Sequence, residues 1–166
     1  MKMYLVHHSN AADAGWHGCD DESQRPLTDK GYEKIGRIAS GLKALHIKPD
    51  CIVSSPYRHA RQTAQLLAIG LNYTQTLFFN ETLAPGGRAE DILCEINDKY
   101  MADCLILVSH EPCISGLIGS LIVDNPAISI HIKNGGVCCL SSEDLCVERK
   151  AVLEWLLTPK LLSKLS

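Results

Sequence analysis

The sequence has no long apolar run and no excess of positive charge, and these absences exclude several classes of protein. No stretch approaches the roughly 20 apolar residues that a transmembrane helix needs, so we expect no membrane association. The formal net charge of -3 lacks the basic excess of a general nucleic-acid binder. The N-terminal stretch MKMYLV turns polar at His7, unlike the apolar core of a secretory signal. We therefore expect a cytoplasmic protein that binds neither membranes nor nucleic acid.

The sequence also lacks a paired-cysteine motif, although it contains eight cysteines. No two of them are spaced as CxxC, and several lie inside apolar runs such as CLILVSH and VCCLSS, where a thiol behaves as a small hydrophobic side chain. Without a secretory signal, we expect them to be reduced. The cysteines are Cys19, Cys51, Cys94, Cys104, Cys113, Cys138, Cys139 and Cys146.

Repeats, low-complexity segments and linkers are absent as well, so we expect residues 1–166 to form a single domain. A chain of this length buries roughly 70% of the surface that it exposes when unfolded, which is enough for a core without a metal or disulfide. The contents of 46% hydrophobic and 21% charged residues are typical of a globular domain.

Short apolar segments alternate with segments of helical periodicity along the chain. The predicted strands cover residues 2–6, 50–55, 76–79, 103–109, 135–141 and 145–150. The predicted helices cover residues 29–45 after an N-cap at Thr28, 56–71, 89–99, 111–122 and 151–165, the last on both sides of Pro159. Strands that alternate with helices predict an α/β three-layer sandwich, with a mostly parallel sheet flanked by helices.

Polar residues follow three of the predicted strands. His7 and His8 follow the first strand, residues 55–61 follow the second, and Ser109 and His110 end the third. Ligands of parallel sheets bind at the carboxyl ends of the strands. We therefore expect these residues, which are distant in sequence, to converge on one rim.

This rim has the features of an anion pocket, with phosphate as the expected ligand. A helix that begins at Ser55 and Pro56 presents free N–H groups and a positive dipole end. Arg58 in its first turn adds positive charge. A neutral imidazole in such a pocket can act as a nucleophile. Either His8 or His110 fits that role, with the other stabilising charge.

Five motifs resemble those of the histidine phosphatase superfamily, in order and approximate spacing, and the match is closest to its short phosphohistidine phosphatase branch. They are YLVHHSNA, RPLTDKGYEKI, VSSPYRHARQTA, LAPGG and LILVSHEPCISGLI. The resemblance extends from the first strand to about Leu140. It implies a phosphoglycerate-mutase-like fold without the large helical insertion of the mutases. It also implies a phosphorylated-histidine intermediate at His8, with His110 as the second pocket histidine.

The chain departs from this family where the resemblance implies two arginines. The arginine–histidine–glycine motif reads His7-His8-Ser9, and the second pocket arginine is His59. Ser109 replaces the glycine before the second histidine. Histidine is charged only below a pKa of about 6.5, and losing one preorganised donor costs about 10²–10³ in rate.

The residues expected to bind phosphate are His7, His59, Arg58, Ser9 and Ser109. Arg58 has the reach to compensate for the missing arginine at the next position. We also expect activity to favour mildly acidic pH, where the additional histidines would gain charge.

Two functions of this pocket remain open. The first is a hydrolase that acts through phosphohistidine at His8 on a phosphohistidine-protein or small phosphomonoester, without a cofactor. Glu81, Glu90 and Glu111 are its candidate general acids, and Glu111 also fits a role at a helix start. The second is a weak or inactive pseudophosphatase that binds phosphate or a phosphoprotein, which the two histidine replacements favour.

A metal site is the third alternative. His7, His8, His59 and His110 would place four imidazoles on one rim, and imidazole is a zinc ligand. Adjacent residues of a strand point to opposite faces, so His7 and His8 are not expected to share a metal. We therefore expect no metal.

Overall fold

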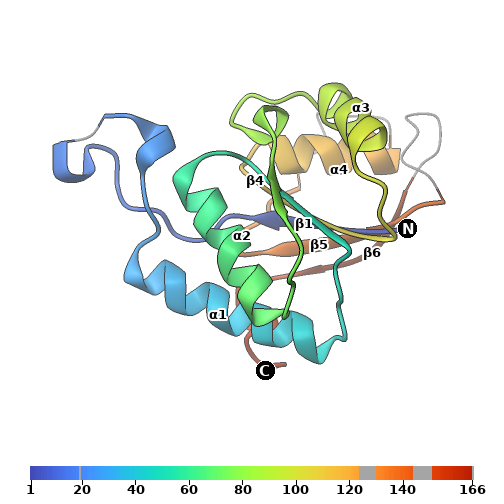
Figure 1. Ribbon diagram of the computed structural model, residues 1–166, viewed down its shortest axis with the longest axis horizontal. Coiled ribbons are helices and arrows are strands. Elements are labelled where there is room, and N and C mark those ends of the chain that lie inside the picture. Colours follow the sequence, from blue (N-terminus) through green and yellow to red (C-terminus); the bar gives the residue numbers. More distant parts are fainter. Residues whose placement is uncertain (19, 124–129, 144–150, 166) are drawn as a thin grey trace.

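The computed structural model describes residues 1–18, 20–123, 130–143 and 151–165, in which six strands form one sheet in the order β3-β2-β4-β1-β5-β6 (Figure 1). The first four strands in the sequence pair in parallel, and the last two pair antiparallel with their neighbours. The strands are β1 (Lys2–His7), β2 (Cys51–Ser54), β3 (Leu77–Phe79), β4 (Cys104–Ser109), β5 (Val137–Ser141) and β6 (Val152–Leu157).

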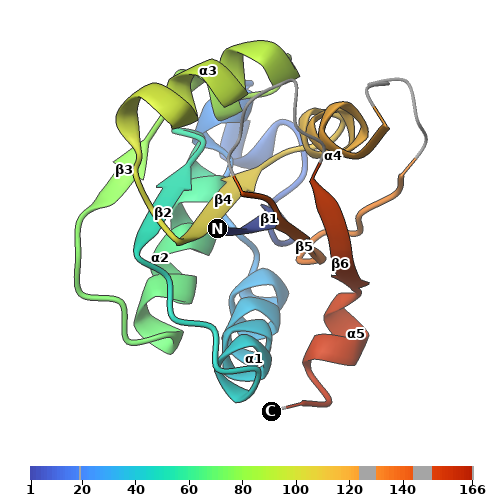
Figure 2. The same cartoon turned by 90° about the vertical axis from the view of Figure 1, so that its right-hand side faces the viewer.

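Helices cover both faces of this sheet, α1 and α2 on one side and α3 and α4 on the other (Figures 1 and 2). The α-helices are α1 (Asp29–Ala44), α2 (Arg58–Gly70), α3 (Ala89–Lys99), α4 (Cys113–Val123) and α5 (Pro159–Leu162). Short 3₁₀ helices cover Trp16–Gly18, Glu22–Gln24 and Glu81–Leu83. The three-layer α/β sandwich is confirmed. None of the described helices combines the length and apolar character needed to cross a membrane.

The strands face two separate cores because their side chains alternate. Met3 and Leu5 of β1 belong to the core shared with α3 and α4. Tyr4 and Val6 belong to the core under α1 and α2. The central strands are therefore apolar on both sides, and polar side chains collect where the strands end.

Helix α1 begins where its sequence predicts. The side chain of Thr28 accepts a hydrogen bond from the Gly31 N–H and so caps the first turn. Ile35, Ile38 and Leu42 form a fully buried stripe at helical spacing.

Helix α2 begins later than predicted, at Arg58 rather than at Pro56. The Ser55 N–H still donates to the Val108 carbonyl at 2.9 Å, so the sheet pairing continues one residue beyond β2. The turn into the helix takes the next two residues, with the Tyr57 N–H donating to Ser55 Oγ at 3.3 Å. Ser55 is therefore a turn residue at the strand end and not the helix N-cap.

The prediction of a helix before Pro159 is wrong, because Val152–Leu157 forms strand β6. This strand pairs antiparallel with β5, and Trp155 packs on Tyr4 with ring centroids 5.8 Å apart. Pairing with the edge of β5 outweighs the local preference of a leucine-rich segment for helix. The helix after Pro159 is confirmed as α5. The predicted strand at 145–150 lies outside the described residues.

The six cysteines in the described part of the chain are unpaired in this structure: Cys51, Cys94, Cys104, Cys113, Cys138 and Cys139. Burial raises the pKa of Cys51 and Cys104 to about 11. It raises the pKa of Cys138 to about 12, so these thiols are poor nucleophiles.

Candidate active site

Three strand ends meet at one rim of the sheet because the strands pair in parallel and in register. His7 of β1 is opposite Ser109 of β4, and Ser54 of β2 is opposite Val108. The residues that follow each strand therefore lie side by side. The His8 N–H donates to the Ser109 carbonyl at 3.1 Å, which extends this pairing.

His8, His59 and His110 form a compact cluster at this rim, which we call the imidazole triad. The ring centroids of His8 lie 4.2 Å from His59 and 4.9 Å from His110, and those of His59 and His110 are 5.1 Å apart. One ring nitrogen of each residue lies within 4.8 Å of the other two. His59 and His110 are buried, whereas His8 is partly exposed. The sheet thus delivers two of these rings, and helix α2 delivers the third.

The hydrogen bonds of His8 and His59 determine which ring nitrogen carries the proton. The nitrogen Nδ1 of His8 lies 2.7 Å from the Ser9 carbonyl oxygen, and Nδ1 of His59 lies 3.1 Å from that of Arg25. A carbonyl only accepts hydrogen bonds, so both Nδ1 atoms carry the proton. In the neutral rings, Nε2 of His8 and Nε2 of His59 are therefore unprotonated and can act as acceptors.

His110 completes this chain of hydrogen bonds. Its Nδ1 lies 3.4 Å from Nε2 of His59, and its Nε2 lies 2.8 Å from Ser55 Oγ. Because Nε2 of neutral His59 can only accept, Nδ1 of His110 donates to it. Nε2 of His110 then accepts from the Ser55 hydroxyl. Ser55 and His110 come from adjacent strands, which fixes the orientation of the His110 ring.

Burial keeps the histidines of the rim neutral. Desolvation, together with repulsion from His59 and His7, lowers the pKa of His8 to about 2. Burial likewise lowers the pKa of His110 to about 3. Burial also lowers the pKa of His7 and of His59 below the usual value. These shifts oppose the expectation that mildly acidic pH charges His7 and His59.

Two of the expected phosphate ligands direct their hydroxyls to the backbone. The hydroxyl of Ser9 donates to the Gly31 carbonyl at 3.0 Å, and its N–H donates to Thr63 Oγ1 at 3.1 Å. The hydroxyl of Ser109 donates to the Leu83 carbonyl at 2.6 Å. In this arrangement, both serines link the rim to neighbouring segments.

His7 and Arg58 also lie differently from the expectation. Nδ1 of His7 lies 2.7 Å from the Ile132 carbonyl oxygen, although its ring remains 4.7 Å from the ring of His8. The guanidinium of Arg58 donates to the Gln24 carbonyl at 3.4 Å and lies 6.0 Å from the Trp16 ring. The contacts of Arg58 are thus with the segment after β1, and not with the triad.

Two of the candidate general acids lie on the surface, and the third lies near the start of α4. Glu81 and Glu90 are exposed, and Glu90 pairs with Arg88 at 3.4 Å. The carboxylate of Glu111 accepts a hydrogen bond from the Ser115 N–H at 3.3 Å, near the start of α4. This contact agrees with the alternative role of Glu111 at a helix start.

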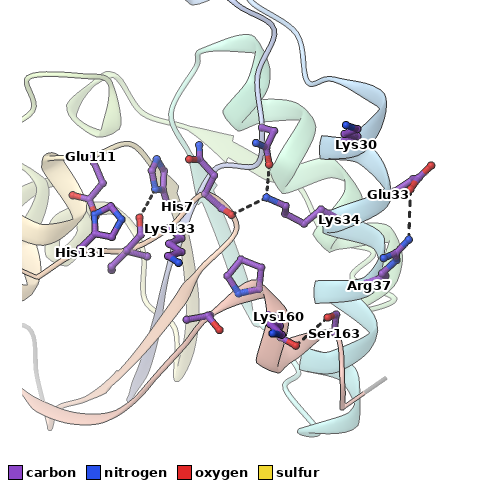
Figure 3. Close-up of a pocket in the computed structure, with 15 residues that line it drawn as sticks. His7, Lys30, Glu33, Lys34, Arg37, Glu111, His131, Lys133, Lys160 and Ser163 are labelled. Carbon is purple, nitrogen blue, oxygen red and sulfur yellow. Dashed lines mark hydrogen bonds and ion pairs between the residues drawn. The ribbon is translucent and has the colours of Figure 1, made fainter.

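A basic cavity of about 800 Å³ lies beside His7, which is one of its lining residues (Figure 3). Lys34 reaches into it and donates to Asn10 and, at 3.4 Å, to the Asn134 carbonyl. Its charged lining residues comprise five cations and two carboxylates, namely Lys30, Lys34, Arg37, Lys133, Lys160, Glu33 and Glu111. His7 lines this cavity and its ring centroid lies 4.7 Å from that of His8, so an anionic surface bound there would lie close to the triad.

Sequence reasoning missed this cavity and the role of Ser55. A signal for the cavity was present, because Lys30, Lys34 and Arg37 recur at the spacing of one helix face. The contributions of residues 131–134 had no such signal, because a loop brings them there.

The sheet order, the helices on both faces and the rim histidines define a phosphoglycerate-mutase-like α/β fold. Known structures agree: the protein histidine phosphatase SixA complexed with tungstate superposes with a TM-score of 0.82 at 20% identity, over 96% of this chain and 98% of that chain. The model of the histidine phosphatase superfamily (branch 1) matches residues 3–85. The chain belongs to this superfamily, and its relatives place it with the short, SixA-like members.

Two curated relatives are similar to this chain in sequence, and one of them is a phosphohistidine phosphatase. Phosphohistidine phosphatase SixA of Escherichia coli (strain K12) is 26% identical over 125 residues, which are 73% of this chain and 74% of that protein. An uncharacterized protein of Picosynechococcus is 28% identical over 144 residues, 86% of each chain.

Proposed function

We propose that the chain is a phosphatase that acts through a phosphohistidine intermediate at His8. The observation that carries this proposal is the hydrogen bond from Nδ1 of His8 to the Ser9 carbonyl at 2.7 Å, which leaves the lone pair on Nε2. Burial lowers the pKa of this ring to about 2, so the lone pair stays free of a proton at neutral pH. A neutral, oriented imidazole is a competent nucleophile.

The proposed reaction has two steps. Nε2 of His8 attacks the phosphorus atom, an N–P bond forms, and the leaving group departs with the electron pair of its bond to phosphorus. Water then attacks the phosphorus atom, a P–O bond forms, the N–P bond breaks with its electron pair returning to Nε2 of His8, and phosphate is released with the protons of that water. His110 donates its Nδ1–H to a phosphoryl oxygen in place of Nε2 of His59. Together, these steps hydrolyse the phosphoryl bond without a cofactor.

We propose a phosphohistidine on an acidic protein surface as the substrate, rather than a free phosphomonoester. Histidine leaves phosphorus more easily than an alkoxide does, so the reaction places less demand on a general acid. The cationic lining of the cavity beside His7 provides a complementary surface for acidic residues around the phosphohistidine (Figure 3).

A second candidate function is a pseudophosphatase that binds a phosphorylated protein without hydrolysing it. The state of His59 favours it: burial lowers the pKa of this ring, whose nitrogens contact Arg25 and His110. It supplies no permanent charge where the family resemblance implies an arginine. The loss of one such donor costs about 10²–10³ in rate.

Turnover of a phosphohistidine peptide and of p-nitrophenyl phosphate tests these two functions. We expect the wild type to release phosphate from both and to form an acid-labile phosphoenzyme, and His8→Gln to do neither. The exposed His46 lies at a backbone φ of 58°, which asparagine tolerates, so His46→Asn is the matched control and should retain full activity. Equal residual rates for wild type and His8→Gln would contradict the phosphatase.

The substrate class is tested by reversing a charge in the cavity. We expect Lys133→Glu to raise KM for an acidic phosphohistidine peptide several-fold and to leave the kinetics of p-nitrophenyl phosphate unchanged. Equal effects on both substrates would contradict docking of a protein surface in this cavity.

A further inference from the structure

The imidazole triad resembles a metal centre in the way each ring is held from outside. Nδ1 of His8 contacts the Ser9 carbonyl, and Nδ1 of His59 contacts the Arg25 carbonyl. Metal-binding histidines almost always use their second nitrogen in this way, because the contact fixes the tautomer and the ring orientation. In these two residues, Nε2 is therefore the nitrogen that can bind a metal ion.

His110 is held by a hydroxyl, which can serve either tautomer. Its Nε2 lies 2.8 Å from Ser55 Oγ, and a hydroxyl both donates and accepts. If the proton of His110 moves from Nδ1 to Nε2, the Ser55 hydroxyl can rotate so that its oxygen accepts a hydrogen bond from Nε2–H. This shift gives His110 a free lone pair on Nδ1, with no net loss of a proton from the site.

The spacing of one pair of inner nitrogens fits a tetrahedral ion. Two nitrogen ligands at the usual zinc distance of about 2.0–2.1 Å lie about 3.3–3.4 Å apart. Nε2 of His59 and Nδ1 of His110 are 3.4 Å apart. One ring nitrogen of each triad member lies within 4.8 Å of the others, and His8 is the only one of the three that is partly exposed.

We propose that His8 Nε2, His59 Nε2 and His110 Nδ1 bind one divalent transition-metal ion of the zinc class, with the fourth position open. Three imidazoles and an open position form a ligand set typical of zinc sites that exchange a ligand. This triad excludes His7, which contacts Ile132, as the alternation along the strand predicts. His59 is essential to the set, and it stands where the family resemblance implies an arginine.

Metal binding at this position has a consequence for the proposed phosphatase. The lone pair of His8 Nε2 is the proposed nucleophile, and it cannot bind a metal and attack phosphorus at the same time. The metal-bound protein is therefore expected to be inactive as a phosphatase until the ion is removed. The metal site itself does not depend on the phosphatase being correct.

Equilibrium dialysis of the full chain against Zn²⁺ or Co²⁺ tests the proposal without an activity assay. We expect one ion per wild-type chain and, with Co²⁺, the visible bands of a tetrahedral site without a thiolate charge-transfer band. His8→Gln and His59→Gln remove ligands and should abolish the spectrum. Ser55→Ala should weaken binding by about 10–100-fold, as is usual for an outer partner of a ligand.

The controls separate this site from other ligands of the chain. His46→Asn should bind the metal ion as the wild type does. Cys94→Ser, which removes an exposed thiol, should also bind it as the wild type does. If His59→Gln does not fold, then His8→Gln, at a partly exposed position, decides the matter. No binding by the wild type, a thiolate band, or unchanged binding by folded His8→Gln would overturn the proposal. Phosphatase activity of chelator-treated protein is measured separately, so either idea can fail alone.

Discussion

At the scale of single residues, position 59 determines the chemistry of the rim. His59 is neutral and buried, and it accepts a hydrogen bond from His110. An arginine at this position would carry a permanent charge and a planar set of donors suited to phosphate oxygens. Histidine at this position instead offers a lone pair on Nε2, which is the group that the proposed metal site uses.

We expect His59→Arg to raise phosphatase turnover by about 10²-fold, because one preorganised donor is worth about 10²–10³ in rate. The same variant should lose the metal, since a guanidinium has no lone pair to donate. Steady-state kinetics and Co²⁺ spectra measure the two effects. Gln65→Arg is the matched control, because it adds the same charge at an exposed position of the same helix. Equal gains in both variants would indicate general electrostatic attraction instead.

At the scale of elements, helix α1 contains one glycine that packs closely against α5 and another that faces open space. A side chain at Gly41 would overlap the Leu162 carbonyl of α5, whereas Gly36 has no atom within 4 Å of the place where its Cβ would lie. Both glycines lie in the same helix, so they share the backbone cost of glycine. They differ only in what surrounds them.

These two positions give a matched pair of variants with opposite outcomes. Gly36→Ala should raise the free energy of unfolding by about 0.5–1 kcal/mol, because alanine is the better helix former. Gly41→Ala should lower it, because α5 has to move away from α1. Urea denaturation of the two variants and the wild type measures the difference. A stabilisation by Gly41→Ala equal to that by Gly36→Ala would show that α5 does not pack closely on α1.

At the scale of the whole molecule, the fold buries ionisable rings that are protonated more easily in the unfolded chain. The pKa of His8 is lowered to about 2 and that of His110 to about 3, against about 6.5 when unfolded. Below pH 6.5, the unfolded chain binds more protons than the folded chain does. The free energy of unfolding therefore falls as the pH falls from 6.5 towards 3.

We expect urea denaturation to show this loss between pH 7.5 and pH 5.5. Each of these two histidines should cost about 1.4 kcal/mol at one pH unit below its unfolded pKa, or about 3 kcal/mol together. His8→Gln should reduce the pH-dependent loss by about half of that sum. A chelator in all samples prevents stabilisation by bound metal. A free energy of unfolding that does not change with pH would contradict the burial of neutral rings.

Much of the architecture could be predicted from local patterns. Alternation of apolar strands with amphipathic helices predicts the three layers, and Thr28 marks the start of α1. Strand β6 was not predictable in this way. Its residues are rich in leucine, and only the free edge of β5 and the contact of Trp155 with Tyr4 favour a strand.

The sequence by itself determined the fold class and the placement of His8 and His110 at one rim, because carboxyl ends of parallel strands always share an edge. Only the tertiary structure decided how the rim histidines are used. His59 lies beside His8 and His110, whereas His7 contacts the Ile132 carbonyl and lines the basic cavity. The reason is physical: the proton on an imidazole is fixed by the carbonyl or hydroxyl that faces it, and those partners come from segments that only folding brings together.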